Sequence, residues 1–331
     1  MKIKTKKKTA LILGVTGQDG ILLSKILIKK KYDVHGLSRS KYKFDIIKKK
    51  YLKYIKHYKC DICETKKIIK LIHTIKPDEI YNFAGVTDLK TSEKDKNYTL
   101  KVNYNCIKII LDQIYSKNNK VKFFQSLSSE MFKKNIELPK NIIDEKSRLK
   151  VNNFYSLSKI KLFKYIKNLR NKKKVSIFCG FLFNHDSFFR DKRFILKKIS
   201  NHLKKNILKR PMKIQNLYFR KDISHAENIV EGIYKLMQSK IPSDVVIGSG
   251  QFISIKQIIT LFLKKLRINA KWKKSGKKIY LKNVVNSNIL FYSSNKIELN
   301  TVLVANPLKL QKISSWKPDP NIKKIINDLV L

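Results

Sequence analysis

The feature that most constrains the fold of this chain is a glycine-rich turn near its start. A short apolar segment, residues 9–13, runs into Gly14-Val15-Thr16-Gly17-Gln18-Asp19-Gly20, and helical periodicity follows over residues 20–30. Glycines in this spacing allow a tight turn, close backbone approach to a pyrophosphate and close packing of helix on strand, while the helix N-terminus favours negative charge. Strand, turn and helix together predict dinucleotide binding.

The first half of the chain continues by alternating short apolar runs with amphipathic segments. The expected strands are residues 9–13, 32–37, 80–83, 122–126 and 175–179. The expected helices are residues 20–30, 65–75, 98–115 and 154–169. This alternation predicts an α/β fold built on a Rossmann-type, doubly wound parallel sheet.

The pattern becomes irregular beyond about residue 180. We expect helices at residues 194–205, 226–237 and 255–266, strands at 212–218 and 243–247, and a loop-rich tail to residue 331. A chain of 331 residues accommodates two domains. We therefore expect a dinucleotide-binding domain over residues 1–180, joined by part of 212–247, and a smaller, mixed substrate-binding region over residues 181–331.

The charge of the chain is strongly unbalanced. Lys and Arg number 74 against 24 Asp and Glu, a net charge of +50 that would ordinarily suggest a nucleic-acid or anionic-membrane partner. Only eight of these cations are Arg, however, whereas nucleic-acid readers favour Arg interleaved with aromatic residues. We interpret the evenly spread Lys as a compositional bias on a solvated surface, compatible with an anionic small substrate, and keep a noncatalytic dinucleotide- or RNA-binding protein as the alternative.

Cysteine usage and hydropathy bear on the cellular compartment, on metal binding and on the presence of a membrane-spanning helix. Four Cys without a secretory signal indicate a reducing, cytoplasmic location. Cys60 and Cys63 form a CxxC motif, but no second pair follows at zinc-like spacing, so we expect no metal site. No apolar span reaches 18 residues, and we expect no membrane-spanning helix.

The end of the second expected strand indicates which dinucleotide is bound. It reads Leu37-Ser38-Arg39-Ser40 and carries no acidic residue. An acid at this point takes the ribose 2′-hydroxyl of NAD, whereas an Arg accommodates the 2′-phosphate of NADP. Arg39 therefore favours NADP.

A candidate catalytic pair lies in the expected helix 154–169. Tyr155 and Lys159 are four residues apart, which places them on one helical face. A Lys ammonium beside a phenol lowers a pKa that starts near ~10, and the Tyr can then act as a base near neutrality. The position of the pair supports a catalytic role, because it follows by about thirty residues the hydroxyl-rich strand end Gln125-Ser126-Leu127-Ser128-Ser129-Glu130.

These motifs together resemble the extended short-chain dehydrogenases/reductases and, within them, the GDP-mannose 4,6-dehydratase family. The resemblance covers nearly the whole chain. The matching segments are GVTGQDG at 14–20, VHG at 34–36, PDEIYN at 77–82, residues 123–130, LFNHDS at 182–187 and WKP at 316–318.

The resemblance implies an NADP-dependent dehydration of GDP-mannose to GDP-4-keto-6-deoxymannose. Tyr155 would take the 4-hydroxyl proton while NADP takes the C4 hydride, and Glu130 would remove the C5 proton and assist loss of the C6 hydroxyl before the hydride returns to C6. Ser128 stands where the family usually has Thr, and its hydroxyl would bind the 4-oxygen. Lys159 would bind the nicotinamide ribose and tune Tyr155.

The resemblance also implies the binding residues. The expected cofactor contacts are Gly14, Val15, Thr16, Gly17, Gln18, Asp19, Gly20, Arg39, Ser40, Asp61, Ile62, Phe83, Ala84, Gly85, Val86, Thr87, Tyr98, Lys159, His185 and Arg190. The expected GDP-sugar contacts are Asn184, Lys198 and Lys296.

The chain departs from the family pattern at several positions. Phe154 replaces a Pro, Lys221-Asp222-Ile223 replaces Arg-Asp-Trp, and Lys296 replaces an Arg. These changes keep another sugar-nucleotide dehydratase, epimerase or 4-keto reductase as an alternative. The segment after Arg39 is shorter than in the family, so we expect a homodimer through residues 98–115 and 154–169, with a tetramer left open.

Overall fold

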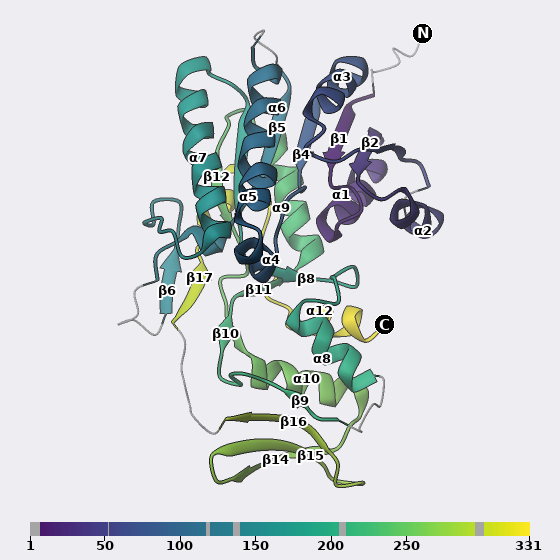
Figure 1. The fold of residues 1–331 in the computed structure, drawn as a ribbon, viewed down its shortest axis with the longest axis vertical. Helices are drawn as coiled ribbons and strands as arrows, with labels where there is room; N and C mark the ends of the chain where they lie inside the picture. The colour runs from purple at the N-terminus through teal and green to yellow at the C-terminus, as the bar shows by residue number, and fades with distance from the viewer. Residues whose placement is uncertain (1–6, 52, 117–119, 135–139, 205–209, 295–300) are drawn as a thin grey trace.

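The computed structural model describes residues 7–51, 53–116, 120–134, 140–204, 210–294 and 301–331. Its centre is a sheet with strand order β12-β7-β5-β4-β1-β2-β3, in which every pairing is parallel (Figure 1). The strands are β1 (Thr9–Leu13), β2 (Asp33–Ser38), β3 (Lys56–Lys59), β4 (Glu79–Asn82), β5 (Lys122–Ser128), β7 (Ile177–Leu182) and β12 (Asp244–Ile247). The predicted doubly wound sheet is confirmed.

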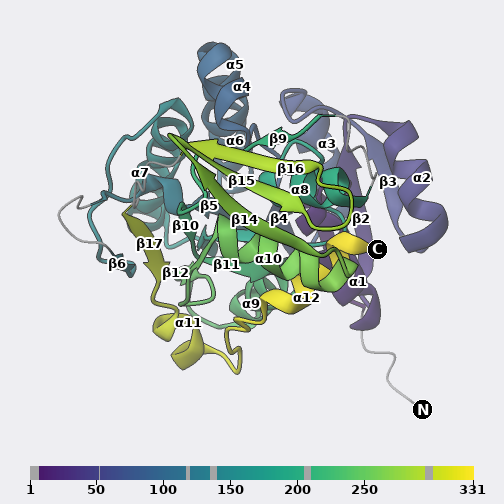
Figure 2. The same cartoon turned by 90° about the horizontal axis from the view of Figure 1, so that it is seen from below.

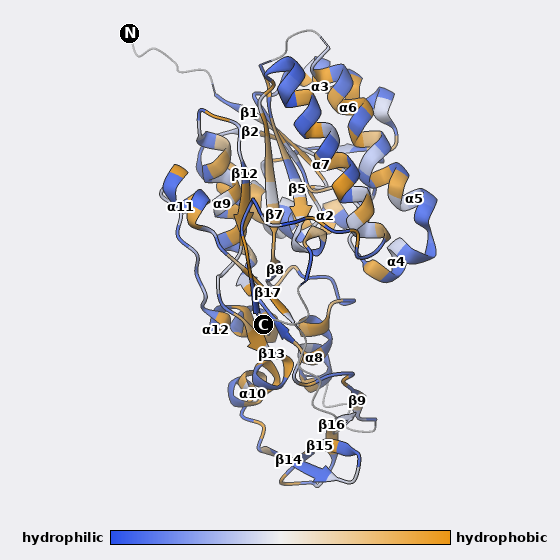
Figure 3. Cartoon of the chain, turned by 90° about the vertical axis from the view of Figure 1, so that its left-hand side faces the viewer, coloured by the Kyte–Doolittle hydropathy of each residue, from blue (hydrophilic) through white to orange (hydrophobic). Residues whose placement is uncertain are grey.

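Helices cover both faces of this sheet, which is why its central strands are near-continuous apolar runs. One face packs beneath α3 (Thr65–Ile75), α6 (Cys106–Ile114) and α7 (Phe154–Lys173). The other packs beneath α1 (Gln18–Lys29), α2 (Lys41–Tyr51) and α9 (Ala226–Gln238). Figure 3 shows the apolar strands enclosed between helices whose outer surfaces are hydrophilic.

The elements of this half that were not predicted include strand β3, helix α2, the short helix α4 (Leu89–Lys94) and strand β6 (Lys140–Ile143). Strand β3 reads KHYK, and the edge strand therefore has no apolar run to reveal it. Terminal lysines on an edge strand also protect it from pairing with another chain. Helix α2 was missed as well, because among those of its residues whose burial the structure describes only Phe44 is fully buried in the core.

The expected helix 98–115 is interrupted by a π-helical turn. It consists of α5 (Lys96–Leu100), the π-turn η1 (Lys101–Asn105) and α6, and it follows the short helix α4 (Leu89–Lys94). Such turns often occur at functional sites because the extra residue re-aims side chains. Here η1 carries Asn103, which is 1% exposed and holds the loop after β4.

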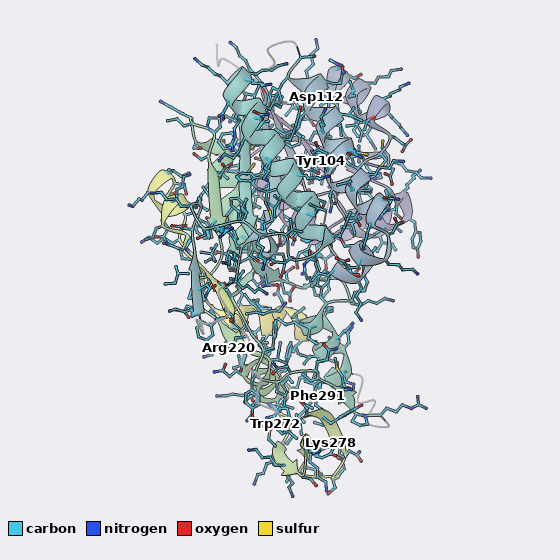
Figure 4. The ribbon with its side chains drawn as sticks, turned by 60° about the vertical axis from the view of Figure 1, so that its left-hand side comes forward. Tyr104, Asp112, Arg220, Trp272, Lys278 and Phe291 are labelled. Carbon is cyan, nitrogen blue, oxygen red and sulfur yellow. The ribbon has the colours of Figure 1, made fainter. Side chains whose placement is uncertain are left out.

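The C-terminal half forms a second body with its own core. Helices α8 (Ile195–Lys204), α10 (Ile255–Leu266) and α12 (Ile322–Val330) pack against the sheet β14-β15-β16-β9 (Figure 2). Its strands are β14 (Ala270–Ser275), β15 (Lys278–Asn283), β16 (Ile289–Ser294) and β9 (Met212–Lys213). Figure 4 shows Trp272, Lys278 and Phe291 at this end of the molecule and Tyr104 and Asp112 at the other.

Short strand pairs and one further helix join the two halves. The pairs are β6 (Lys140–Ile143) with β17 (Val302–Ala305), β8 (Asn184–Asp186) with β11 (Ile223–His225), and β10 (Arg220–Lys221) with β13 (Ile253–Ser254). Helix α11 (Leu308–Ile313) packs beside β12 and α9.

Two expectations about this half were wrong. The tail after residue 266 is not loop-rich, because it contributes β14 to β17, α11 and α12. Buried Ile279 and Leu281 do alternate with outward residues in β15, but lysines throughout the segment concealed that period of two. The expected strand 212–218 shrinks to Met212–Lys213, the two residues of this segment whose register with β16 is that of a strand pair.

The described residues contain no helix that combines the length and the apolar character needed to cross a bilayer.

Candidate active site

The glycine turn after β1 has the geometry expected from its sequence. Gly14 has φ +90°, and a Cβ there would lie 2.9 Å from the Ala84 nitrogen. A Cβ on Gly20 would lie 2.5 Å from the Gly14 carbonyl oxygen, so the helix could not approach the turn so closely with any other residue. Gly17 is the N-cap of α1 and leaves the helix N-terminus open to an anion.

A cavity of about 480 Å3 opens at the carboxyl ends of β1 to β4, beside this turn. That edge of a parallel sheet is where such folds bind ligands. The residues lining it that the sequence predicted are Gly14, Thr16, Gly17, Gln18, Asp19, Arg39, Asp61, Ile62, Phe83, Ala84, Gly85, Val86, Thr87, Tyr98 and Arg190. The structure thus brings together cofactor residues from segments far apart in the chain.

Other predicted cofactor residues lie behind the wall instead of lining it. Val15 is fully buried and packs where a Cβ on Gly36 would collide with it. Ser40 caps α2, since its Oγ accepts the Lys43 N–H at 3.1 Å. Gly20 supports the turn, and Lys159 and His185 act through the contacts described below.

Arg39 lies at the cavity rim. Its Nη1 donates to the Tyr98 hydroxyl at 3.0 Å, and its Nε is 3.9 Å from the Asp61 carboxylate. The side chain is 71% exposed, so its donors remain free to turn toward a phosphate. This placement fits a group that recognises the adenine-side ribose.

A buried ion pair holds the first turn of α1. His185 Nε2 lies 3.0 Å from Asp19 Oδ1, and His185 Nδ1 lies 2.7 Å from the Phe183 carbonyl oxygen. Both partners are acceptors, so both ring nitrogens donate and the imidazole is positively charged. Burial alone would lower the pKa of His185, but the Asp19 carboxylate raises it above its usual value. Burial likewise opposes ionisation of Asp19, yet His185 and Arg190 hold its pKa below the ordinary range.

Arg190 connects this pair to the rest of the cavity. Its Nε is 2.5 Å from Asp186 Oδ1, and its guanidinium carbon lies 3.5 Å from the centre of the Phe194 ring. Stacking and pairing hold the guanidinium plane in one orientation on the cavity wall.

The predicted catalytic side chains meet where β5 ends and α7 begins. Strand β5 ends at Ser128, the short helix η2 (Ser129–Met131) carries Glu130, and an Asn153 capping box starts α7 two residues before Tyr155. The Tyr155 side chain is 7% exposed and forms a hydrogen bond with Ser128. A phenol, a hydroxyl and a carboxylate are therefore gathered within one site.

The protonation states at this site differ from the sequence-based expectation. Burial raises the pKa of Tyr155 to about 12, against the hydrogen bond from Ser128 that lowers it. The prediction that Lys159 lowers this pKa is not met, because Lys159 Nζ donates to the Ser126 carbonyl at 3.0 Å and lies 5.8 Å from the Tyr155 ring centre. Burial also lowers the pKa of Lys159, to about 8.

Lys159 links the catalytic group to the cavity. A Cβ on Gly85 would lie 3.8 Å from Lys159 Nζ and 2.9 Å from Asn103 Oδ1. Asn103 in turn accepts the Val86 N–H at 2.8 Å and donates to Ser158 at 3.2 Å. Sequence reasoning missed Asn103, because only the π-turn of η1 aims it at this loop.

The expected substrate residues have mixed outcomes. Asn184 Nδ2 donates to the Asp222 carbonyl at 3.3 Å, next to the site, whereas Lys198 is exposed on α8. Lys296 lies outside the described residues. Lys221, to which the sequence assigned no role, reaches Asn184 Oδ1 at 3.5 Å and lies in the electrostatic field of Glu130 and Asp186.

Asp222 is a structural residue of this region. Its carboxylate accepts the N–H groups of Ser249 at 3.0 Å, Gly250 at 3.1 Å and Ala305 at 2.9 Å. One buried carboxylate thereby ties β10, the loop after β12 and β17 together. Burial raises the pKa of Asp222 despite these bonds.

No cluster of three or more His, Cys, Asp or Glu side chains with metal-binding potential occurs in the part of the chain that the structure describes.

Comparison with known proteins agrees with this geometry. The family model described as GDP-mannose 4,6 dehydratase matches residues 11–329. The chain is 29% identical over 350 residues to GDP-mannose 4,6 dehydratase 2 of Caenorhabditis elegans, covering 100% of this chain and 90% of that protein. It is 28% identical to GDP-mannose 4,6 dehydratase of Drosophila melanogaster, covering 98% and 86%.

Solved structures share the fold. The UDP-glucose 4-epimerase of Thermotoga maritima superposes with a TM-score of 0.79 at 13% identity, covering 97% of each chain. The RMD protein of Pseudomonas aeruginosa, complexed with NADPH, superposes with a TM-score of 0.75 at 14% identity, covering 98% of each chain. With a family model that spans nearly the whole sequence, the chain belongs to the GDP-mannose 4,6-dehydratase family.

Proposed function

We propose that this enzyme converts GDP-mannose to GDP-4-keto-6-deoxymannose and that its cofactor is NADP. The observation that carries the proposal is Glu130, which stands two residues after Ser128, where β5 ends, and acts electrostatically on Tyr155. A simple reductase or an epimerase needs a Tyr and a Lys but no carboxylate directed at C5. The relatives named above support the same substrate class.

The cavity fits a nicotinamide dinucleotide. Its glycine turn has room for a pyrophosphate only because Gly14 and Gly20 lack Cβ atoms, and the α1 N-terminus faces that space. Structural neighbours were solved with NADPH in one case and NAD+ in another, so the choice of NADP rests on Arg39. When bound, the cofactor accepts a hydride from C4 and returns it to C6.

Tyr155 is proposed as the base for the 4-hydroxyl. Ser128 donates toward the phenol and holds the 4-oxygen beside it. Lys159 Nζ, which donates to the Ser126 carbonyl at 3.0 Å, would hold the ribose hydroxyls of the nicotinamide, and its ammonium charge would favour the phenolate of Tyr155. Once Tyr155 has taken the hydroxyl proton and C4 has given up its hydride, C4 is a ketone, and this ketone acidifies the hydrogen on C5.

Glu130 is proposed as the base and acid for the elimination. Its carboxylate takes the C5 proton and delivers a proton to the departing C6 hydroxyl, so that water leaves without a second acid. Tyr155 finally gives its proton to C5, when addition of the hydride to C6 reduces the double bond between C5 and C6. The substrate changes overall by the loss of one water, with no net oxidation.

The C-terminal half is proposed to hold the GDP-sugar. Asn184 and Lys221 lie beside Glu130, and Lys198 and Lys296 supply further cations for the diphosphate. On this view residues 1–180 with β12 form the dinucleotide domain, and most of the remainder forms the substrate domain.

The decisive experiment incubates the purified protein with GDP-mannose and NADP+ and follows the 4-keto product together with reduced cofactor. We expect product to accumulate without stoichiometric NADPH. Turnover of another nucleotide sugar alone would refute the substrate, net NADPH consumption would identify a reductase, and an epimerised sugar would identify an epimerase. Retention on RNA that resists GDP-mannose would favour the nucleic-acid alternative.

We also propose a homodimer through α6 and α7 in a reducing, cytoplasmic setting. The four cysteines are free thiols, as that setting requires. The outer face of α7 carries exposed lysines, including Lys161 and Lys164, so like charges would oppose such a dimer. Sedimentation at increasing salt should show association strengthening, and a monomer at every salt concentration would refute the dimer.

A further inference from the structure

One cysteine of the CxxC motif, Cys63, is paired with Cys106 and not with Cys60. Cys60 Sγ donates to the Asp61 carbonyl at 3.4 Å, whereas Cys63 Sγ lies 3.2 Å from the Sγ of Cys106. Cys106 is 43 residues away in sequence and is the first residue of α6. The fold therefore pairs two thiols that no sequence spacing would connect.

The two sulfur atoms are already close to bonding distance. A disulfide has a sulfur–sulfur separation of about 2.05 Å, so closure needs a movement on the order of 1 Å. Cys106 is 3% exposed, but Cys63 lies in the turn before α3 and is only partly buried. Cys63 is thus the more accessible residue of the pair, and Cys106 is the more buried one.

The position of this pair relates it to the cavity. Asp61 and Ile62, which immediately precede Cys63, line the cavity, and so does Val102 of η1, which precedes Cys106. The Cys63 N–H donates to Asp61 Oδ1 at 2.8 Å, so movement of Cys63 is transmitted to that carboxylate. A bond between the two sulfurs would join two walls of the cavity.

We propose that Cys63 and Cys106 form an oxidation site, which a low-molecular-weight disulfide converts to a disulfide that distorts the dinucleotide cavity. The Cys63 thiolate attacks one sulfur of oxidised glutathione, breaks its disulfide bond and expels one glutathione thiolate. Cys106 then gives its proton to solvent and attacks Cys63 Sγ, expelling the second glutathione. Two cysteine thiols are oxidised while one glutathione disulfide is reduced to two thiols.

The surroundings make this reaction slow and selective. Burial, with Cys106 and Asp61 adding to it, raises the pKa of Cys63 to about 12, so little thiolate is present near neutrality. The pair therefore reacts slowly near neutrality and responds to sustained oxidation.

The effect on dinucleotide binding rests on the proposed function. A displacement on the order of 1 Å at Asp61 and Ile62 misplaces contacts at the adenine side of the cavity, and we expect NADP+ affinity to fall by about three- to tenfold. Reduction with dithiothreitol should restore it.

The test treats the full-length protein with oxidised glutathione at mildly alkaline pH and maps disulfides by non-reducing peptide mass spectrometry. We expect a Cys63–Cys106 peptide in the wild type and in Cys60→Ser, and none in Cys106→Ser. Glutathione adducts without that peptide, or a Cys60–Cys63 peptide in its place, would overturn the proposal. Cys106→Ala provides a second variant if Cys106→Ser unfolds, and thermal melting of each variant identifies that case.

NADP+ titration of the reduced and oxidised wild type completes the test. Unchanged affinity in a protein mapped as oxidised would overturn the link to the cavity. Failure of the reduced protein to bind NADP+ would count against the proposed function, whereas peptide mapping would still decide the oxidation site by itself.

Discussion

The two ends of the active-site region are built in different ways. At the glycine end the shape depends on the backbone, because Gly14 and Gly20 bring a turn, a helix and the loop after β4 into contact. At the catalytic end the shape depends on buried polar side chains: Lys159 donates a hydrogen bond to the Ser126 carbonyl, and Tyr155 forms a hydrogen bond with Ser128.

Because of this difference, we expect the glycine end to govern cofactor binding and the catalytic end to govern the rate of the reaction. A backbone cradle tolerates no added atom, but its state does not change with pH. Buried ionisable groups have displaced pKa values, about 12 for Tyr155 and about 8 for Lys159, so their reactivity depends on what binds beside them. Substitutions at the two ends should therefore affect different measurements.

The largest expected effect is at Glu130. Glu130→Gln removes the base for C5, and turnover should fall by about 10^3-fold, the usual contribution of a general base. NADP+ affinity should stay within error, and reduced cofactor should build up on the enzyme because the first hydride transfer still proceeds. Tyr155→Phe is the matched variant, since it should abolish that build-up as well. Loss of NADP+ binding in Glu130→Gln would contradict its catalytic role.

Gly14→Ala should act on the other end. An Ala at φ +90° is strained, and its Cβ would press on the Ala84 nitrogen, so we expect NADP+ affinity to fall on the order of 100-fold. Gly276→Ala is the control, because Gly276 also has a positive φ of 53° but a Cβ there would meet no atom within 4 Å. That control should lose about 1 kcal/mol of stability and no affinity. Equal loss of NADP+ affinity in both variants would show that the absence of a Cβ at Gly14 is not specifically required for cofactor binding.

A smaller effect is expected at the rim of the glycine end. Arg39→Met should weaken NADP+ binding by roughly 30-fold, the value of a lost hydrogen bond to a charged group, while NAD+ binding changes little. Calorimetric titration with both dinucleotides measures the preference directly. A parallel decline for NAD+ would mean that Arg39 shapes the cavity without reading the 2′-phosphate.

The smallest effect tests a buried ion pair that joins the two halves. Asp19 has a lowered pKa, so its contribution to stability is present above its ordinary value of 3.8 and is lost as pH falls through the lowered pKa. His185 has a raised pKa, so its contribution is present below its ordinary value of 6.5 and is lost as pH rises through the raised pKa. Asp19→Asn should therefore cost about 1 to 2 kcal/mol between these pH values and less once the pH exceeds the raised pKa of His185.

Urea unfolding of the wild type and Asp19→Asn across that range provides the measurement. A difference between the two proteins that stays constant with pH would show that the imidazole is not charged. Glu231→Gln, on the exposed surface of α9, serves as a control for the general loss of an acid in a basic chain.

Much of the dinucleotide half could be predicted from local sequence. The glycine turn, the apolar strands and the helix around Tyr155 each depend on residues within one element and its neighbours, and the structure contains them where expected. The C-terminal half was harder, because β14 to β16 alternate apolar residues with lysines in a chain where lysine is everywhere. A period of two is informative only when the outward residues differ from the background.

The sequence by itself determined that the chain builds a parallel sheet with a dinucleotide turn and carries a Tyr, a Lys and a Glu suited to sugar chemistry. Tertiary structure alone decided their states and partners. Burial set the pKa of Tyr155 and Lys159, the π-turn aimed Asn103 at Val86, and the packing of α3 on α6 brought Cys63 to Cys106. Residue type and spacing act along the chain, whereas desolvation and contact depend on what folds back against each side chain.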